Sequence, residues 1–245
     1  IITDRERKDR MIFTKSNKYD KDFLMKNMMG PNCIKILEEL TSKIKLEKGM
    51  RILDLGCGKG ISSIFLAKEF DATVFATDLW IEPTENYKRF KEFKLDDKIF
   101  PIQAEAHELP YAEGFFDAVI SVDSYHYFGN KEGFLDNHIS PLVKEGGILA
   151  MAMPGLKEDF VDCIPDELIP FWQDNMNFHS ITWWNKLWSE SESVIVEKCE
   201  ALNCHDEAWK DWINCDNSYA INDKKMMEVE NGKYFNTISL IARTK

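Results

Sequence analysis

The sequence predicts an α/β fold in which a doubly wound, mostly parallel sheet is covered by helices on both faces. Strand-like and helix-like segments alternate along residues 30–153, and a glycine-rich loop, Gly56–Gly60, joins the first strand to a helix. The chain has 245 residues, 44% of them hydrophobic, and is long enough to bury a core without disulfides. We expect one domain over residues 31–245, preceded by an N-terminal arm at 1–30.

The expected helices and strands follow from the spacing of apolar residues. Apolar residues recur with a helical period from Ile34 to Ile44 and predict a helix over 33–44. Short apolar, β-rich runs predict strands at 51–55, 73–77, 98–103, 116–122 and 147–151. Helical patterns between them predict helices at 61–70, 84–93 and 132–139. Two late strands at 194–199 and 234–242, separated by a helix near 207–213 and a polar loop around 216–232, complete seven strands.

The regular alternation stops after Met153. Pro154, Pro165 and Pro170 punctuate an aromatic-rich stretch without an obvious strand, so residues 154–190 are expected to form an insertion after the fifth strand. Six of the seven tryptophans lie in this stretch or shortly after it, at positions 172, 183, 184, 188, 209 and 212. We expect the insertion to contribute to substrate recognition.

Charge and composition exclude several classes of protein. A net charge of -11 argues against a protein that follows a phosphate backbone, and no apolar run approaches the roughly 18 residues of a membrane span. Six cysteines without a CxxC pair fit a reducing compartment. Residues 1–10 carry seven charges and no apolar leader segment, so no secretory signal is expected. These features predict a cytoplasmic protein with a small-molecule partner.

The loop that follows the first expected strand reads Asp54-Leu55-Gly56-Cys57-Gly58-Lys59-Gly60. A dinucleotide fingerprint requires a third glycine where Ile61 stands, and a phosphate-binding P-loop requires Lys directly after Gly60. The carboxylate of Asp54 would repel a pyrophosphate but would suit a ligand that carries an ammonium group. The loop therefore favours a cationic ligand.

The pattern D-x-G-x-G-x-G, at Asp54, Gly56, Gly58 and Gly60, resembles motif I of the class I S-adenosylmethionine-dependent methyltransferases. The resemblance extends over most of residues 30–153. It implies a Rossmann-like, seven-stranded sheet, S-adenosyl-L-methionine as the cofactor and S-adenosyl-L-homocysteine as the product.

The resemblance also assigns cofactor-binding residues. The glycine loop, with Cys57 filling space, would wrap the amino-acid end of the cofactor. Asp78 would bind both ribose hydroxyls, or alternatively cap a helix, and Leu79 follows it. Glu105 and Ala106 would hold the adenine. Two further candidate contacts are Ser121, in the fourth strand, and Tyr19, in an N-terminal segment that would fold over the cofactor as a lid.

Tyr125 and His126 follow the fourth strand, at the sheet edge where ligands bind in open α/β sheets. Both are candidates to border the transferred methyl group. Methyl transfer from a sulfonium is an in-line displacement that depends mainly on orientation, so a base is optional. For an amine or a phenol acceptor, His126 could take the proton. The alternative is that His126 only packs behind the strand.

Aromatic residues are the candidates for the acceptor pocket, because aromatic faces attract ammonium cations. The set comprises Tyr127, Trp172, His179, Trp183 and Trp184, and the alternative is that these rings form core. Cys199, Cys204, His205 and Cys215 match no zinc spacing, so no metal is expected.

The sequence thus predicts a cytoplasmic methyltransferase that moves a methyl group to a nitrogen, oxygen or sulfur of a small molecule. Three alternatives remain open: a polymer acceptor such as RNA or protein, a lipid acceptor as in cyclopropane-forming relatives, and a module that binds the cofactor without turnover. No nucleic-acid or membrane partner is expected.

Overall fold

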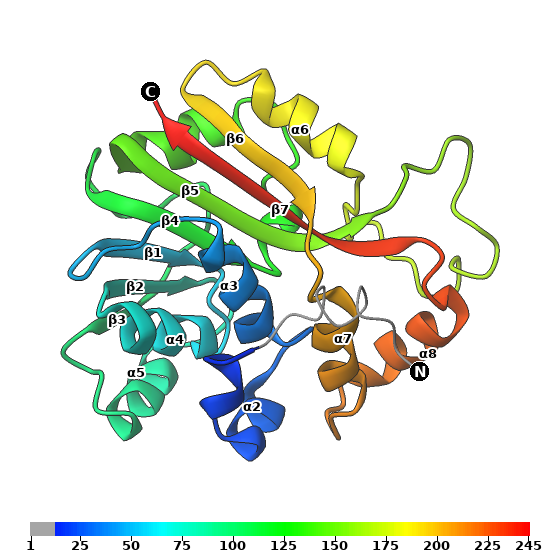
Figure 1. Ribbon diagram of the computed structural model, residues 1–245, viewed down its shortest axis with the longest axis horizontal. Coiled ribbons are helices and arrows are strands. Elements are labelled where there is room, and N and C mark those ends of the chain that lie inside the picture. The colour runs from blue at the N-terminus through cyan, green and yellow to red at the C-terminus, as the bar shows by residue number, and fades with distance from the viewer. Residues whose placement is uncertain (1–12) are drawn as a thin grey trace, which may run out of the picture.

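The computed structural model describes residues 13–245, and residues 1–12 of the predicted N-terminal arm lie outside them. Seven strands form one sheet with the order β3-β2-β1-β4-β5-β7-β6 (Figure 1). The strands are β1 (Arg51–Leu55), β2 (Thr73–Asp78), β3 (Ile99–Gln103), β4 (Phe116–Val122), β5 (Val143–Leu156), β6 (Val194–Ala201) and β7 (Phe235–Thr244). Strand β7 runs antiparallel to both its neighbours, and the other pairs are parallel. The predicted mostly parallel seven-stranded sheet is confirmed.

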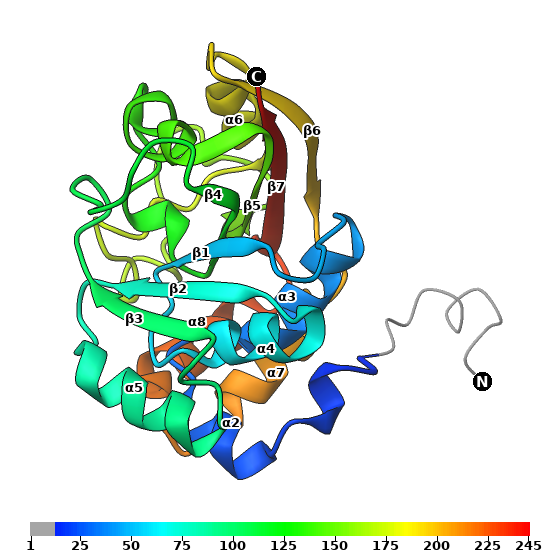
Figure 2. The ribbon, with the colours of Figure 1, turned by 90° about the vertical axis from the view of Figure 1, so that its left-hand side faces the viewer.

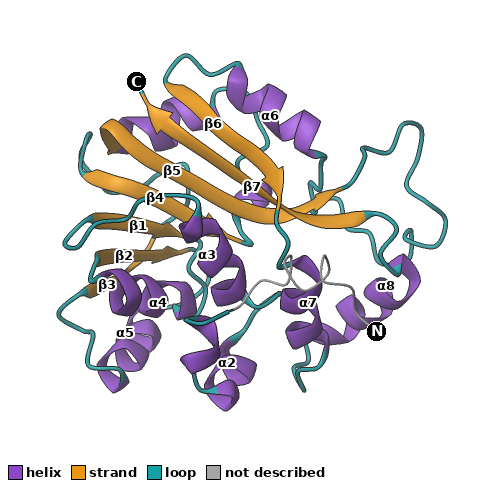
Figure 3. Cartoon of the chain, in the orientation of Figure 1, coloured by secondary structure: helices purple, strands orange, loops and turns teal. Residues whose placement is uncertain are grey.

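Seven α-helices accompany the sheet in the described chain (Figure 3). They are α2 (Lys21–Asn27), α3 (Cys33–Ser42), α4 (Ile61–Phe70), α5 (Pro83–Glu92), α6 (Ile181–Ser189), α7 (His205–Ile213) and α8 (Ala220–Glu230). Four short helical turns complete the list: η1 (Ser16–Lys18), η2 (Tyr125–Tyr127), η3 (Leu135–Ile139) and η4 (Ser140–Leu142).

Alternate residues of the central strands enter two separate hydrophobic cores, one on each face of the sheet. Ile52 packs in the core shared with α3, α4 and α7, whereas its neighbour Leu53 packs in the core shared with α6 and η3. Successive side chains of a strand point to opposite faces, so a strand covered on both faces is apolar throughout. Figure 2 shows α3 and α4 together on one side of the strands.

The structure differs from the predicted elements in the C-terminal half. The expected polar loop around 216–232 contains helix α8, whose only buried residues are Ala220, Met226 and Glu230. Such spacing gives no apolar stripe, and tertiary contacts hold the helix instead. The Nε1–H of Trp212 in α7 donates to Asp223 over 2.8 Å, and the Glu230 carboxylate accepts the backbone N–H of Phe235 over 2.8 Å.

Three further boundaries also differ. Helix α6 lies inside the stretch taken as an irregular insertion; the Ser180 side chain accepts the N–H of Trp183 at its start. The helix expected at 132–139 is only the five-residue turn η3. Strand β5 continues to Leu156 rather than ending at 151, because β7 pairs with it through Phe235.

Candidate active site

A cavity of about 390 Å³ opens at the carboxyl ends of strands β1 to β4. The strand order reverses between β1 and β4, and ligands of open α/β sheets bind at such a switch point. The lining comes from the glycine loop, the ends of the neighbouring strands and the segment before α3. It includes Gly56, Cys57, Gly58, Lys59, Asp78, Leu79, Trp80, Glu105, Ala106, Asp123, Ser124, Tyr127, Phe128, Asn175 and residues 27–31.

The glycine loop is held in shape by its own backbone. The N–H groups of Gly56 and Cys57 both donate to the Thr77 carbonyl, over 2.8 and 3.1 Å, and the N–H of Gly60 donates to the Cys57 carbonyl. The Gly58 N–H donates to Asp78 over 2.8 Å. A phosphate cradle needs backbone N–H groups that point at the ligand. These four amides already have protein acceptors, which agrees with the absence of a phosphate motif.

Gly56 allows the segment after β4 to approach the loop closely. Its φ is +75°, and a Cβ added there would lie 1.8 Å from the Ser124 Oγ. Any other residue would therefore be strained in its backbone and would also push Ser124 away. This contact brings the ends of β1 and β4 together at the floor of the cavity.

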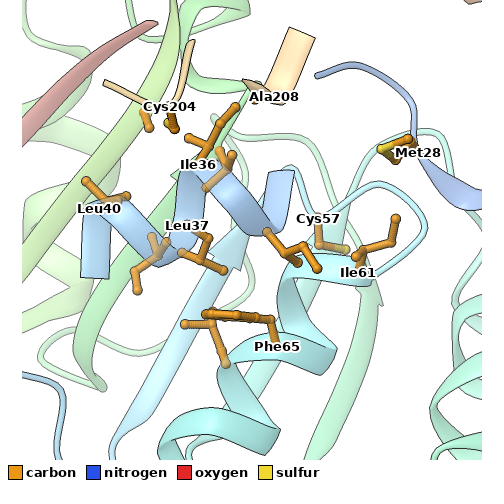
Figure 4. Close-up of a cluster of buried hydrophobic side chains, with 14 of the residues drawn as sticks. Met28, Ile36, Leu37, Leu40, Cys57, Ile61, Phe65, Cys204 and Ala208 are labelled. Carbon is orange, nitrogen blue, oxygen red and sulfur yellow. The ribbon is translucent and has the colours of Figure 1, made fainter. Parts of the chain in front are cut away.

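Cys57 fills space between the loop and the core. Figure 4 shows its side chain beside Ile61 of α4, close to the helix α3 that carries Ile36 and Leu37. Burial raises the pKa of the Cys57 thiol well above its usual value, with the charges of Asp54 and Asp78 adding to the effect. The thiol is therefore un-ionised and is no nucleophile at neutral pH.

Asp54 lies beneath the loop and does not line the cavity. Only 1% of the residue is exposed, and its carboxylate accepts the hydroxyl protons of Ser62 and Ser63 over 2.6 and 2.5 Å. Burial raises its pKa to about 6, although the two serine hydrogen bonds oppose the shift. Asp54 thus ties the end of β1 to the first turn of α4.

Asp78 closes β2 and faces the cavity. One carboxylate oxygen accepts the Gly58 N–H, and the other accepts the N–H groups of Trp80 and Ile81 over 2.8 and 3.0 Å. A carboxylate offers about four acceptor positions, so capacity remains for a ligand hydroxyl. Asp78 does not cap α5, whose N-cap residue is Glu82.

Glu105 and Ala106 line the cavity beyond β3, and Leu79 lies beside them at the end of β2. The Glu105 carboxylate accepts the backbone N–H of His107 over 2.9 Å, and the His107 Nδ1 lies 2.8 Å from it. Burial disfavours the ionised form, but these contacts lower the pKa of Glu105 below its usual value. The side chain is therefore an anionic hydrogen-bond acceptor at neutral pH.

Besides Asp54, three more predicted cofactor contacts lie away from the cavity. Gly60 begins α4 and backs onto Phe90. Ser121 is fully buried in β4. Tyr19 packs on Phe65 with a ring-centroid distance of 5.7 Å. Near the end of the same N-terminal arm and just after it, Met28, Met29, Gly30 and Pro31 line the cavity.

The structure does not bring Tyr125 or His126 to the cavity. Tyr125 is fully buried, with its ring 6.0 Å from that of Trp184, and burial raises the pKa of its hydroxyl. His126 is 1% exposed and packs on Phe178, with 5.6 Å between ring centroids. Burial lowers the pKa of His126 to about 3, so its ring is neutral at physiological pH. Tyr125 and His126 both lie in the short helical turn η2, and both side chains are buried in the core.

Of the five residues expected in the acceptor pocket, only Tyr127 lines the cavity. Trp184 is fully buried under the sheet, and His179 stacks on Trp183 at 3.7 Å. Trp172 packs on Phe160 inside the insertion, 5.7 Å between ring centroids. Within residues 13–245 no group of three or more His, Cys, Asp or Glu is placed to hold a metal ion.

Sequence reasoning missed Trp80, Asp123 and Asn175. Asp123 directly follows β4, and Asp78 is the last residue of β2. The rule that ligands bind at the carboxyl ends of the strands therefore applies to both residues. Trp80 stands outside the tryptophan cluster, and no sequence motif marks it. Nothing in the sequence signals Asn175, which reaches the cavity from the insertion.

The cavity suits S-adenosylmethionine in its charge and in its donor set. Three carboxylates, those of Asp78, Glu105 and Asp123, face it against the single ammonium of Lys59. The cofactor carries a sulfonium and an ammonium group with one carboxylate, so an acidic lining attracts it. The free capacity of Asp78 matches ribose hydroxyls, and Glu105 matches an exocyclic amine.

Comparison with known proteins points the same way. Residues 53–151 match the family described as "Methyltransferase domain". The methyltransferase GfsG of Streptomyces halstedii is 27% identical over 119 residues, which are 48% of this chain and 42% of that protein. The 27-O-demethylrifamycin SV methyltransferase of Amycolatopsis mediterranei is 29% identical over 119 residues, 48% of this chain and 43% of its own length. The match thus spans less than half of each of these two relatives.

Solved structures share the fold over most of the chain. A geranyl diphosphate methyltransferase in complex with S-adenosylmethionine superposes with a TM-score of 0.68 at 16% identity, covering 87% of this chain and 86% of that one. No helix among residues 13–245 is long and apolar enough to cross a membrane. Residues 53–151 thus match a methyltransferase domain, and over most of its length the chain shares the fold of a solved S-adenosylmethionine-dependent methyltransferase.

Proposed function

We propose that this protein is an enzyme that transfers a methyl group from S-adenosylmethionine to a small-molecule acceptor. The observation that carries the proposal is the Asp78 carboxylate. It locks the glycine loop through Gly58 and keeps acceptor capacity inside a cavity at the strand-order switch point. Asp78 and Glu105, at the ends of β2 and β3, would hold such a cofactor, and the lining after β4 would remain for the acceptor.

The residues contribute binding and orientation. The bound cofactor supplies an activated methyl group on sulfur, and the enzyme must align that methyl with the acceptor atom, which can remove several kcal/mol from the barrier. Asp78 fixes the ribose end and Glu105 the adenine end. Met28, Met29 and Pro31 close over the loop, and we assign the lid role of the N-terminal arm to this turn.

A small acceptor agrees with the size and charge of the site. A cavity of about 390 Å³ lies in the range of small-molecule pockets, and the net charge of -11 opposes nucleic acid. The two curated relatives and the solved relative also carry methyltransferase names, one of them for a rifamycin. Asn175 lines the cavity, which supports a role of the insertion at 154–190 in recognising the acceptor. All six cysteines are free thiols, which supports a cytoplasmic location.

Cofactor binding is tested by replacing Asp78. The variant Asp78→Asn places an amide NH2 group against backbone N–H donors and removes the charge near the ribose. Hydrogen bonds to a charged group contribute about 1.5–3 kcal/mol, so we expect S-adenosylhomocysteine to bind about 10- to 100-fold more weakly. The measurement is calorimetric titration, with Asp97→Asn, on an exposed turn before β3, as the matched control.

The outcome separates the proposed function from its alternatives. Equal affinity in Asp78→Asn and the wild-type protein would remove Asp78 from the site. Failure of the wild-type protein to bind S-adenosylhomocysteine would refute the function itself. Binding without release of S-adenosylhomocysteine, across amines, alcohols, thiols and acids incubated with the cofactor, would favour a module without turnover.

A further inference from the structure

Asp123 occupies the side of the cavity that the cofactor does not need. It follows β4, which pairs with β1 on the side away from β2 and β3. The residues that match ribose and adenine are Asp78, the last residue of β2, and Glu105, just after β3. A ligand that extends from Glu105 to the glycine loop therefore ends next to Asp123, at the place where the methyl acceptor must enter.

The position of Asp123 is built into the fold. Its backbone has a φ of +58°, a left-handed conformation that is uncommon for residues other than glycine but is adopted more often by Asn, Asp and His, and its N–H donates to the Ala152 carbonyl over 2.8 Å. Gly30 lies so close that a Cβ added there would sit 2.0 Å from the carboxylate Oδ2. Backbone strain of this kind persists where the surrounding structure holds it, and it clusters at functional sites.

The carboxylate of Asp123 is held without a hydrogen-bond donor. Among residues 13–245 no side chain or backbone N–H donates to it, although it is largely withdrawn from solvent. A half-buried carboxylate without a partner costs free energy, and a ligand that carries a cation or an N–H donor would recover it.

The charges around Asp123 are negative or neutral. Asp223 faces it from α8, Cys33 from α3 and Tyr127 from η2. Burial, with repulsion from Asp223, raises the pKa of Asp123 to about 8. Burial, with a smaller contribution from the charge of Asp123, raises the pKa of Tyr127 and of Cys33, so neither of those groups ionises to compete for a cation. When Asp123 is ionised, an anionic acceptor such as a carboxylate or a phosphate ester would be repelled here.

Two exposed aromatic rings stand at the mouth of the same cavity. Trp80 is 68% exposed and Tyr127 is 45% exposed, and their ring centroids lie 6.3 Å apart in an edge-to-face arrangement. Both line the cavity together with Asp123. Large rings are seldom left in solvent by chance at a binding site, and ring faces attract ammonium groups.

We propose that the methyl acceptor is a basic amine, and that Asp123 binds its ammonium group beside Trp80 and Tyr127 and takes its proton. This inference rests on the proposed function and names the substrate class of that site. His126 cannot serve instead, because it is buried behind η2 and does not reach the cavity.

The proposed step conserves atoms and charge. The acceptor R–NH3⁺ transfers one proton to the Asp123 carboxylate and becomes R–NH2. The nitrogen lone pair then forms the bond to the methyl carbon while the carbon–sulfur bond breaks, and its electron pair stays on sulfur as a neutral thioether. The products are R–NH2–CH3⁺ and S-adenosylhomocysteine, and Asp123 returns its proton to water through the open mouth. A base with a pKa near the working pH suits this transfer.

The test compares the wild-type protein with Asp123→Asn, an isosteric change that keeps the αL backbone conformation. Each protein is saturated with S-adenosylhomocysteine and challenged with benzylamine, phenethylamine and ethanolamine, and with benzyl alcohol and benzoate. Melting temperature reports binding, and methylation is followed separately with S-adenosylmethionine. Asp97→Asn is the control for loss of one surface charge.

We expect at least one amine, and neither the alcohol nor the acid, to raise the melting temperature of the wild-type complex and to be methylated. In Asp123→Asn that shift should vanish and kcat/KM for the amine should fall at least about 100-fold, while the shift produced by S-adenosylhomocysteine stays unchanged. The acidic limb of the pH profile of kcat/KM should also disappear.

Four results would overturn the assignment. The wild-type protein could bind or methylate benzoate or benzyl alcohol in preference to amines, or no amine could raise its melting temperature. Asp123→Asn could methylate amines as well as the wild-type protein does. Finally, S-adenosylhomocysteine could fail to raise the melting temperature of Asp123→Asn. The last would make Asp123 a cofactor ligand. Failure of the proposed function looks different, because the wild-type protein would then show no shift with S-adenosylhomocysteine at all.

Discussion

The free energy of unfolding should fall as the pH rises, because the Asp123 carboxyl must ionise in the folded protein. Asp123→Asn should remove this decrease. The pKa of Asp123 is about 8 in the folded chain and 3.8 in an unperturbed chain. Between these values the unfolded state has released a proton that the folded state still holds. The unfolded state therefore binds fewer protons, and stability falls as the pH rises from about 4 to about 8.

The magnitude follows from the shift. Each pKa unit corresponds to about 1.4 kcal/mol, so a shift of roughly four units would cost at most about 5–6 kcal/mol at pH 8. Asp123 faces a cavity that opens to water, and solvent screens part of this cost. We therefore expect a penalty of at least about 2 kcal/mol that still grows as the pH approaches 8. For a chain of this size, about 2 kcal/mol corresponds to a difference of about 4–8 °C in melting temperature, so the difference at pH 8 should be at least that large.

The assay is chemical or thermal unfolding of the wild-type protein and of Asp123→Asn at pH 4, 6 and 8. Both proteins carry a neutral side chain at pH 4, and their stabilities should be nearly equal. The variant should be more stable at pH 6 and most clearly so at pH 8. Because all other titrating groups are shared, the difference between the two proteins isolates Asp123.

Two results would refute this reasoning. A stability difference that does not change with pH would show that the Asp123 carboxyl titrates at an ordinary value. A variant that is less stable than the wild-type protein at pH 8 would show that the ionised carboxylate has a stabilising partner in the folded chain.

Three further changes test other parts of the site and core. Gly56→Ala should lose at least about 1 kcal/mol of stability and bind S-adenosylhomocysteine more weakly, because the added Cβ would meet Ser124. The control is Gly114→Ala, which also has a positive φ but has no atom within 4 Å of the added Cβ, and it should keep full binding. Trp188→Ala should cost about 3–5 kcal/mol in denaturant unfolding yet leave the S-adenosylhomocysteine shift intact, and loss of that shift would contradict its place in the core. The buried, neutral His126, with a pKa lowered to about 3 by burial, should make stability fall by about 1.4 kcal/mol per pH unit below 6.5. His126→Asn should flatten that slope between pH 6.5 and 4.5, and an unchanged slope would show that His126 protonates in the folded protein.

The sequence predicts the first half of the fold closely because local signals agree there. Strands β1 and β4 and helix α4 fall at the predicted residues, since apolar runs and the glycine loop mark their ends. Helix α8 could not be predicted, because the contacts that hold it come from α7 and from the start of β7. Its sequence alone carries no amphipathic period.

The cofactor side of the site was easier to anticipate than the acceptor side. Asp78, Glu105 and Gly58 lie at fixed offsets from strands and meet in one cavity. Aromatic composition was a poor guide to the acceptor side: Trp184 is in the core, whereas the isolated Trp80 lines the cavity. Whether a ring faces a core or a ligand depends on the turn that carries it, and spacing in the sequence does not encode that turn.

The glycine loop has its hydrogen bonds in place before any ligand arrives. Gly56, Cys57 and Gly60 donate to carbonyls of the chain, and Gly58 donates to Asp78. The cofactor half of the site is therefore preorganised, and binding there pays little entropy of ordering. The exposed side chains of Trp80 and Tyr127 line the cavity on the acceptor side instead. Diversification toward new acceptors could proceed on that side alone, leaving the framework that receives the cofactor untouched.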